Sequence, residues 1–341
     1  MASKWILRKG SKERGFRYVA PAGAGAMSAA VRERIRSLGI PPAWQDVHVA
    51  WDSRAAIQAW GLDARGRKQY RYHPRAVAKG ELRKFYRVRQ MARDLPAIRR
   101  KISADSRRRG FPRDKVSAVV VRLIAHGFFR VGSERYVREN NTFGMTTMRK
   151  SHVSVYGDNI VFDYEGKRSI QHRQVVVDAG LARLIRAFLG TPGARLFRYQ
   201  SDGGWRDLDS SEVNDYFRSL TGFPYTVKDL RTWGGTLRAA TVLAELGPGT
   251  TKSETKRNVS TTLRLVASEL GNTPAICRKA YVHPALIAQY TRKGATIEWA
   301  TPGKGPTDPL SHAPEEKALI EFLDRHFPER RRSRRATNNV E

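Results

Sequence analysis

The spacing of apolar residues changes along the chain, and the change separates regions with different predicted secondary structure. In the first 80 residues, short runs alternate between apolar and polar positions, which is typical of half-buried strands. One stretch has helical spacing instead and is ended by Gly39 and the prolines after it. The predicted strands cover residues 17–19, 47–51, 56–60 and 69–73, and the predicted helix covers residues 31–38. Residues 1–80 are therefore predicted to form a small, sheet-rich domain.

From residue 81 onward, apolar residues recur at the three- and four-residue spacing of helices that bury one face. Residues 152–177 interrupt this pattern with two extended runs, 160–164 and 169–177, and place Lys167 at the tip of a predicted β-hairpin. The predicted helices cover residues 81–94, 114–129, 133–140, 181–189, 211–220, 227–246, 259–270 and 273–281. Residues 81–300 are thus predicted to form a mostly helical domain.

Polar and glycine-rich segments mark the connections in the last third of the chain. Residues 247–257 are predicted to be a connector, and the Gly/Pro-containing residues 301–309 a linker. A helix is predicted over residues 315–327, followed by a basic tail that contains the arginines of 330–335. The predicted fold is α+β, with a sheet-rich domain at 1–80, a helical domain at 81–300, and a linker, helix and tail at 301–341.

The charge balance indicates a polyanionic partner. Lysine and arginine number 63 against 32 acidic residues, which gives a formal net charge of +31. Such a field attracts nucleic acid, whereas membrane binding would require an amphipathic basic anchor or a lipidation motif, and we find neither. No window approaches the roughly 18 apolar residues of a membrane span, and the N-terminus does not resemble a secretory signal. The single cysteine excludes an internal disulfide and fits a reducing cytoplasm.

Four residues spread over half the chain have side chains suited to phosphodiester cleavage. A tyrosine hydroxyl can attack phosphorus if the site favours its ionisation, since its free pKa is about 10. Paired guanidiniums suit the negative charge of the transition state, and a lysine can protonate the departing sugar oxygen. The candidates are Tyr281, Arg130, Arg231 and Lys167. Lys228 would share a helix face with Arg231 and could assist the lysine.

Each of these residues alone would be weak support for a site. A single arginine among 63 basic residues is more often a solvated surface charge, and one tyrosine of 12 usually packs in a core or on a surface. His126 and His283 lie near the candidates in sequence but lack the carboxylate or histidine neighbours of a metal site. We therefore predict no metal and no cofactor, and the joint pattern of the four residues is what carries the hypothesis.

In order and spacing, four segments resemble the type IB DNA topoisomerases, most of all their small bacterial and poxviral branch. These segments are 128–132 (Phe-Phe-Arg-Val-Gly), 165–167 (Glu-Gly-Lys), 228–232 (Lys-Asp-Leu-Arg-Thr) and 271–281, which runs from Gly-Asn-Thr-Pro to the tyrosine. The resemblance extends from about residue 39 to residue 281. It implies a monomer that clamps duplex DNA, a 3′-phosphotyrosyl intermediate, strand rotation and religation, without ATP or metal. It also implies a cytoplasmic enzyme associated with the nucleoid.

The same resemblance implies a role for each candidate. Tyr281 would be the nucleophile, Arg130 and Arg231 the phosphate clamp, and Lys167 the general acid, aided by Lys228. Poxviral and eukaryotic members of the family place a histidine nine residues before the tyrosine, and here that position holds Asn272. An amide can donate a hydrogen bond to a phosphate oxygen but cannot carry charge or transfer a proton.

Further residues match positions with which family members contact DNA. Residues 66–72 resemble the segment that contacts the groove, and Tyr136 matches another DNA-contacting position. Basic groups of that segment can neutralise phosphates, while amide and phenol groups can reach base edges. The DNA-binding candidates are Lys68, Gln69, Tyr70, Tyr72 and Tyr136.

Two other functions stay open at this point. Tyrosine recombinases use a similar Arg/Lys/Arg/Tyr site, but they have a helical N-terminal domain and a histidine two residues before the second arginine. Here Asp229 holds that position and the N-terminal region is predicted to be sheet-rich, so the topoisomerase is favoured. A non-catalytic DNA-binding protein would need only the charge, and it would give Tyr281 no special role.

Overall fold

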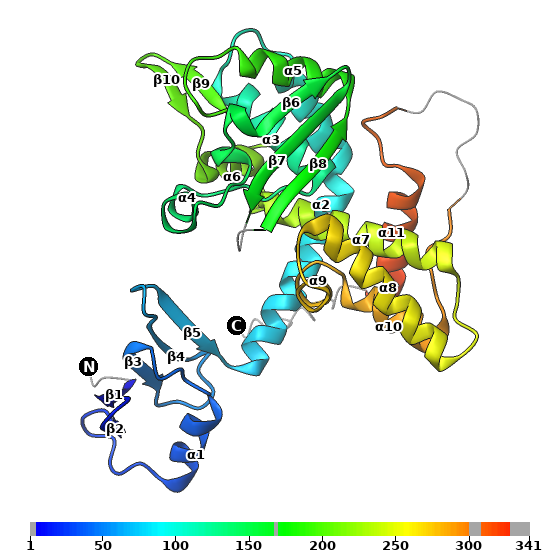
Figure 1. Cartoon of the computed structure of the whole chain (residues 1–341). Coiled ribbons are helices and arrows are strands. Elements are labelled where there is room, and N and C mark those ends of the chain that lie inside the picture. The colour runs from blue at the N-terminus through cyan, green and yellow to red at the C-terminus, as the bar shows by residue number, and fades with distance from the viewer. Residues whose placement is uncertain (1–4, 167–169, 300–307, 328–341) are drawn as a thin grey trace, which may run out of the picture. The chain divides into compact units, whose positions relative to one another are not determined.

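The computed structural model describes residues 5–166, 170–299 and 308–327. The chain divides into two compact units, Met1–Phe85 and Tyr86–Glu341 (Figure 1). The arginine-rich segment 330–335 lies outside the described residues. No helix among the described residues is long and apolar enough to cross a membrane.

The first unit is a five-stranded antiparallel sheet in the order β2-β1-β3-β4-β5, with one helix, α1 (Ala29–Ser37). Its strands are β1 (Trp5–Ser11), β2 (Gly15–Val19), β3 (Gln45–Ala50), β4 (Ile57–Leu62) and β5 (Lys68–Tyr72). Alternate residues of the central strands, together with Ile35 of α1, form a core on one face of the sheet. The four predicted strands and the helix are confirmed. Strand β1 was missed, although it lies between β2 and β3.

The second unit begins within α2 (Pro74–Ser106), and here the prediction that a helix stops before Pro96 is wrong. The helix continues through Pro96. Proline has no N–H, so the carbonyl of Ala92 loses its usual partner in the helix. His312 Nε2 lies 2.7 Å from that carbonyl oxygen and replaces the missing donor. A distant residue thus lets the helix pass a position that local sequence marks as an end.

The middle of the second unit is a three-stranded sheet with helices against it (Figure 1). Its strands are β6 (Val153–Tyr156), β7 (Asn159–Gly166) and β8 (Ile170–Val177), and β7 pairs with β8 as the predicted hairpin. The surrounding helices are α3 (Arg113–Gly127), α4 (Glu134–Asn140), α5 (Ala179–Leu189) and α6 (Ser210–Ser219). The two-stranded ribbon of β9 (Arg198–Ser201) and β10 (Gly204–Asp207) was not predicted.

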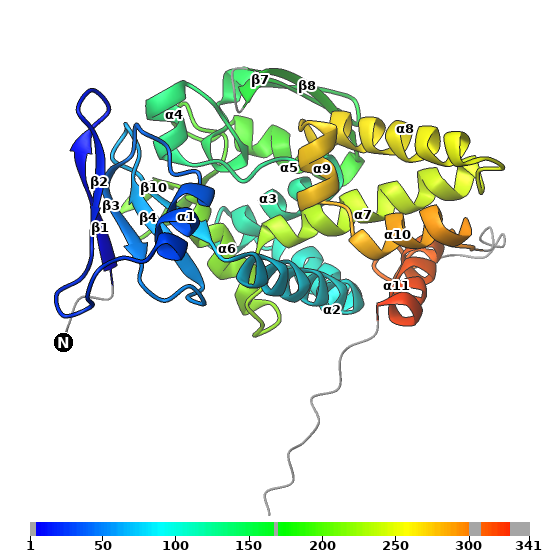
Figure 2. The ribbon, with the colours of Figure 1, turned by 90° about the horizontal axis from the view of Figure 1, so that it is seen from below.

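The last part of the second unit is helical, and α7 contacts α3, α8 and α11 (Figure 2). Its helices are α7 (Val227–Leu246), α8 (Lys252–Leu270), α9 (Pro274–Ala280), α10 (Pro284–Lys293) and α11 (Pro314–His326). The predicted connector at 247–257 is partly wrong, because Thr251 caps a helix that starts at Lys252 by accepting from the Glu254 N–H at 3.1 Å. Helix α10 was missed. The α+β fold of a sheet-rich N-terminal unit and a mostly helical larger one is confirmed.

Candidate active site

Helix α7 holds Arg231 in a buried position. The side chain is only 4% exposed, and its Nη2 donates to the Leu270 carbonyl at 3.0 Å. Two glycines that follow Arg231 in this helix, Gly234 and Gly235, allow other segments to approach closely. A Cβ at Gly234 would overlap the ring of Phe128, and one at Gly235 would lie 3.3 Å from the Cβ of Tyr281. The Gly-Gly pair therefore lets α7 touch both the segment before Arg130 and the candidate nucleophile.

Tyr281 ends α9 and lies beside Arg231. Its N–H donates to the Cys277 carbonyl at 2.9 Å, and its own carbonyl accepts from Thr236 Oγ1 at 3.0 Å. The Cζ atom of Arg231 is 5.4 Å from the centroid of the tyrosine ring. Cys277 is fully buried, and burial raises the pKa of its thiol to about 11, so it acts as a small apolar residue.

Arg130 follows α3 on an irregular segment that backbone hydrogen bonds hold in place. Phe128 ends α3 with a left-handed conformation, φ 52°, which non-glycine residues adopt rarely. The carbonyl of Arg130 accepts from the Met145 N–H at 2.8 Å, and that of Val131 from Thr146 at 2.7 Å. The guanidinium Nη2 donates to the Gly271 carbonyl and to Asn272 Oδ1, the latter at 3.1 Å.

The C-terminal end of α8 therefore holds both arginines. The carbonyls of Leu270 and Gly271 accept from Arg231 and Arg130 respectively. Terminal carbonyls of a helix lack partners within the helix and carry its partial negative charge, so they favour cations. Gly271 caps the helix with φ 59°, and the Asn272 Nδ2 donates to Leu270 at 3.1 Å. Asn272 thus links the two arginines through its amide.

These side chains converge on one cleft of about 650 Å³. Arg130, Arg231, Lys228 and Tyr281 line it, and Arg218 adds a fourth cation. The remaining lining residues are Val131, Ser210, Ser211, Asn214, Thr226 and Val227, so no carboxylate is among the described residues that line it. An adjoining cavity of about 250 Å³ is lined by Tyr136 together with Arg130 and Tyr281. The chemistry of this lining suits a phosphate.

Two residues of the hairpin lie close enough to the arginines to interact with their charge, and sequence analysis missed both. Tyr164 and His172 are paired across β7 and β8, with ring centroids 5.4 Å apart. Burial raises the pKa of Tyr164 to about 12. Burial, then Arg130 and Arg231, lower the pKa of His172. Both are therefore neutral at pH 7. A Cβ at Gly271 would overlap the His172 ring, so this ring supports the loop that binds Arg130.

Burial also affects the pKa of the Arg231 guanidinium. Desolvation lowers its pKa, Arg130 acts in the same direction, and Tyr281 and Tyr164 act in the opposite one. A guanidinium remains protonated under such conditions because its free pKa exceeds 12. The cleft consequently holds a fixed positive charge, poorly solvated by water, next to the candidate nucleophile.

Of the remaining catalytic candidates, the structure describes Lys228 but not Lys167. Lys167 lies outside the described residues; β7 ends at Gly166 and β8 begins at Ile170, which are paired. Lys228 is exposed at the cleft. Asp229, by contrast, is 2% exposed and accepts from Arg87 at 2.7 and 3.0 Å, so it anchors α7 to α2.

In the first unit, the DNA-binding candidates of β5 fall on two faces of the sheet. Tyr70 and Tyr72 are 38% and 50% exposed and stack with centroids 5.7 Å apart, and Lys68 Nζ lies 3.7 Å from the centroid of Trp60. Gln69 alternates to the other side, where its amide donates to Asp63 at 3.0 Å. Trp5, His48 and Trp60 also form ring contacts in this sheet, and sequence analysis missed them.

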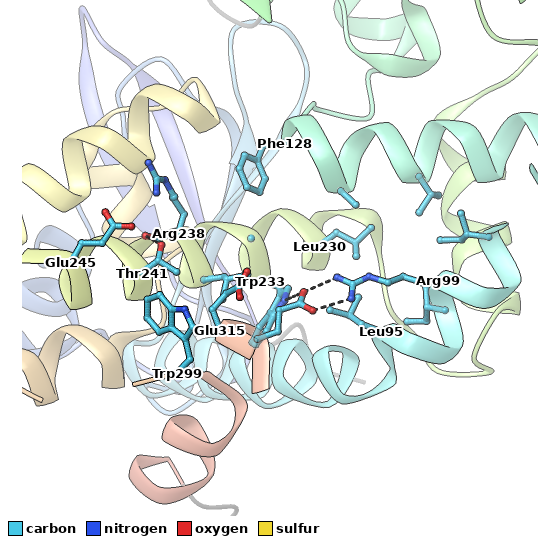
Figure 3. Close-up of a pocket in the computed structure, with 17 residues that line it drawn as sticks. Leu95, Arg99, Phe128, Leu230, Trp233, Arg238, Thr241, Glu245, Trp299 and Glu315 are labelled. Atoms are coloured by element: carbon cyan, nitrogen blue, oxygen red, sulfur yellow. Dashed lines mark hydrogen bonds and ion pairs between the residues drawn. The ribbon is translucent and has the colours of Figure 1, made fainter. Parts of the chain in front are cut away.

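A separate cavity, of about 510 Å³, lies among α2, α3, α7 and α11 (Figure 3). The ion pair of Arg99 with the buried Glu316, at 2.6 Å, and the indole of Trp233 line it. None of the predicted site residues is among its described lining residues. No group of three or more His, Cys, Asp or Glu side chains suited to a metal ion occurs among the described residues.

Comparison with known proteins gives the family. The family model of "Eukaryotic DNA topoisomerase I, catalytic core" matches residues 73–302, and that of "Bacterial DNA topoisomerase IB, N-terminal domain" matches residues 15–63. DNA topoisomerase 1B of Acanthamoeba polyphaga mimivirus is 31% identical over 258 residues, 73% of this chain and 77% of the relative. That of Vaccinia virus (strain Copenhagen) is 24% identical over 239 residues, 67% of this chain and 70% of the relative.

The chain therefore belongs to the type IB DNA topoisomerases, isomerases that relax supercoiled DNA through transient strand cleavage. The N-terminal match and the viral relatives place it in the small bacterial and viral branch of that family. The predicted resemblance is confirmed, and DNA is the substrate. The hypotheses of a tyrosine recombinase and of a non-catalytic DNA-binding protein are set aside.

Proposed function

We propose that Tyr281 is the nucleophile of this topoisomerase. Its Oη attacks the scissile phosphorus as the bond to the 5′ oxygen breaks, leaving a 3′-phosphotyrosyl link and a free 5′-hydroxyl. Lys167 gives the departing oxygen its proton, aided by Lys228, and the phenol proton passes to solvent. Religation reverses these steps after strand rotation. The observation that supports the proposal is the convergence of Tyr281, Arg130 and Arg231 on one cleft.

The arginines stabilise the transition state in this proposal. Their guanidiniums face a cleft without a described carboxylate, and α8 holds them before DNA arrives. Preorganised donors of this kind contribute about 10²–10³ in rate each. Asn272 fixes Arg130 through its Oδ1, and an amide at this position adds a hydrogen bond but no charge.

Relaxation of a supercoiled plasmid tests the nucleophile. The assay contains EDTA and no ATP, since the proposed chemistry uses protein groups alone. We expect wild type to relax the plasmid and Tyr281→Phe to have no activity while still binding DNA. Tyr156→Phe, a change at a 68%-exposed tyrosine, is the matched control and should keep full activity. Relaxation by Tyr281→Phe would show that another group attacks.

We further propose that the protein acts as a monomer that clamps duplex DNA in the cytoplasm, at the nucleoid. In this proposal residues 1–80 form one arm of the clamp, residues 81–300 the catalytic arm, and the basic tail within 301–341 adds affinity. The exposed tyrosines of β5 and the cationic cleft give each arm a surface suited to DNA. Sedimentation with a short duplex should give one protein per duplex, and two proteins per duplex would contradict the monomer.

A further inference from the structure

Thr236 is a buried residue of α7 whose hydroxyl connects that helix to the backbone around Tyr281. It is 1% exposed and lies five residues after Arg231. Its Oγ1 is 3.0 Å from the Tyr281 carbonyl, 3.1 Å from the His283 N–H and 2.8 Å from the Thr232 carbonyl. A hydroxyl has one proton to donate and two lone pairs to accept. Here it accepts from the His283 N–H, and the Thr232 and Tyr281 carbonyls share its one proton, so it connects α7 to both ends of the turn after α9.

The close approach at Gly235 strengthens this connection. A Cβ at that position would lie 3.3 Å from both the Cβ and the carbonyl oxygen of Tyr281. The turn that carries the tyrosine therefore rests directly on α7, and the neighbouring hydroxyl supplies polar contacts at the point where the backbones meet. His283 is 1% exposed, so removal of the hydroxyl would take away a buried hydrogen bond at this turn.

We propose that Thr236 is a positioning residue for the cleavage reaction, which sets the place of Tyr281 relative to Arg231. The proposal rests on the proposed role of Tyr281 as nucleophile. Arg231 and Thr236 share one helix, in which five residues span about 7.5 Å along a stiff axis. Because the hydroxyl contacts the backbone at the Tyr281 carbonyl and at the His283 N–H, α7 carries both Arg231 and the anchor of the turn that follows the nucleophile.

Loss of the Thr236 hydroxyl should slow the cleavage reaction. A displacement of about 1 Å in a reacting group can lower a rate by about 10²-fold. Thr236→Val keeps the size and the branched shape of the side chain but removes the hydroxyl, so the turn loses its anchor without a cavity. DNA affinity should not change, because the hydroxyl is buried away from the cleft surface and is not among the described residues that line the cleft.

Thr262 provides a matched control on the neighbouring helix. It is 0% exposed, and its Oγ1 donates to the Asn258 carbonyl at 2.8 Å, four residues earlier in α8. Thr262→Val therefore removes a buried hydroxyl and the same kind of intrahelical hydrogen bond that Thr236 makes with Thr232. Thr236→Ser retains the hydroxyl and serves as the conservative variant.

The test is single-turnover formation of the covalent complex on a nicked suicide duplex, with the Kd for the duplex and the Tm measured in parallel. We expect Thr236→Val to slow cleavage about 10- to 100-fold at unchanged Kd. Thr236→Ser should restore the rate to within a few-fold, and Thr262→Val should lower Tm without slowing cleavage.

Two outcomes would overturn the inference: Thr236→Val no slower than Thr262→Val, or Thr236→Ser as slow as Thr236→Val. The Tyr281→Phe variant in the same assay separates this inference from the proposed function. If it still forms a covalent complex, the nucleophile is wrong. If it forms none while Thr236→Val cleaves at the wild-type rate, only the positioning role fails.

Discussion

The β5 surface of the N-terminal sheet and the cleft of the catalytic unit both gather cationic and aromatic side chains, but they hold them in opposite ways. On β5, Tyr70 and Tyr72 are 38% and 50% exposed and stack on each other. In the cleft, Arg231 is 4% exposed and hydrogen-bonded to the end of α8. Exposed, adaptable groups suit recognition of a polyanion, whereas fixed, poorly solvated charges suit stabilisation of a transition state. Variants in the two regions should therefore affect different measured quantities.

The largest effect is expected at Arg231. Arg231→Ala should lower the rate of cleavage by about 10²–10³-fold, because a preorganised donor to the transition state is lost. Arg231→Lys should rescue little of it, since an ammonium lacks the planar fork that reaches both Leu270 and a phosphate. Single-turnover cleavage at saturating DNA measures this effect. Full activity of either variant would contradict a catalytic role for the buried charge.

A smaller effect is expected at Asn272. Asn272→Ala removes the Oδ1 that accepts from Arg130, and we expect cleavage to slow by roughly 10-fold, the equivalent of one hydrogen bond to a charged group. Asn272→His introduces a group that titrates near pH 6.5, so its cleavage rate should acquire a pH dependence in that range that wild type lacks. Rate–pH profiles of the three proteins measure this. An unchanged rate in Asn272→Ala would show that Arg130 needs no such support.

Substitutions on the β5 surface should change DNA binding and leave the cleavage rate unchanged. Lys68→Ala is expected to reduce the slope of log K against log salt concentration by about 0.9, the value for one phosphate contact, with cleavage at saturating DNA unchanged. Gln69→Ala, on the opposite face and hydrogen-bonded to Asp63, is the control and should leave the slope unchanged. Fluorescence anisotropy over a salt series measures both. Slower cleavage by Lys68→Ala at saturating DNA would remove the distinction between the two regions.

The smallest effect concerns stability rather than rate. The pKa of His172 is lowered from 6.5 by burial and by the two arginines, so the unfolded chain binds its proton more readily than the folded one. The resulting stabilisation is fully present above pH 6.5 and is lost as pH falls from there through the folded pKa. Free energies of unfolding from urea titrations should decrease less over this window in His172→Gln than in wild type. Equal pH dependence would show that folding does not lower the pKa of His172.

Residue patterns and motifs predicted those helices and site residues that depend on local sequence. Helix α7 has the predicted bounds, and the motifs grouped Arg130, Arg231 and Tyr281, which line one cleft in the structure. Sequence analysis missed what depends on distant partners. The helix continues through Pro96 because His312 replaces the missing N–H donor, and the contact of Thr236 with the turn after α9 joins residues 45 positions apart. Tyr164 and His172 belong to no motif that the sequence shows, because their proximity to the arginines arises from tertiary packing.

Mass spectrometry of the trapped covalent complex tests the central claim most directly. Wild-type protein is incubated with a suicide duplex from which the 5′-hydroxyl fragment dissociates, then digested with protease and nuclease. We predict that the nucleotide adduct is found on the peptide that contains Tyr281, linked through a 3′-phosphate. An adduct on any other residue, or a 5′-phosphate linkage, would contradict the assignment of the site.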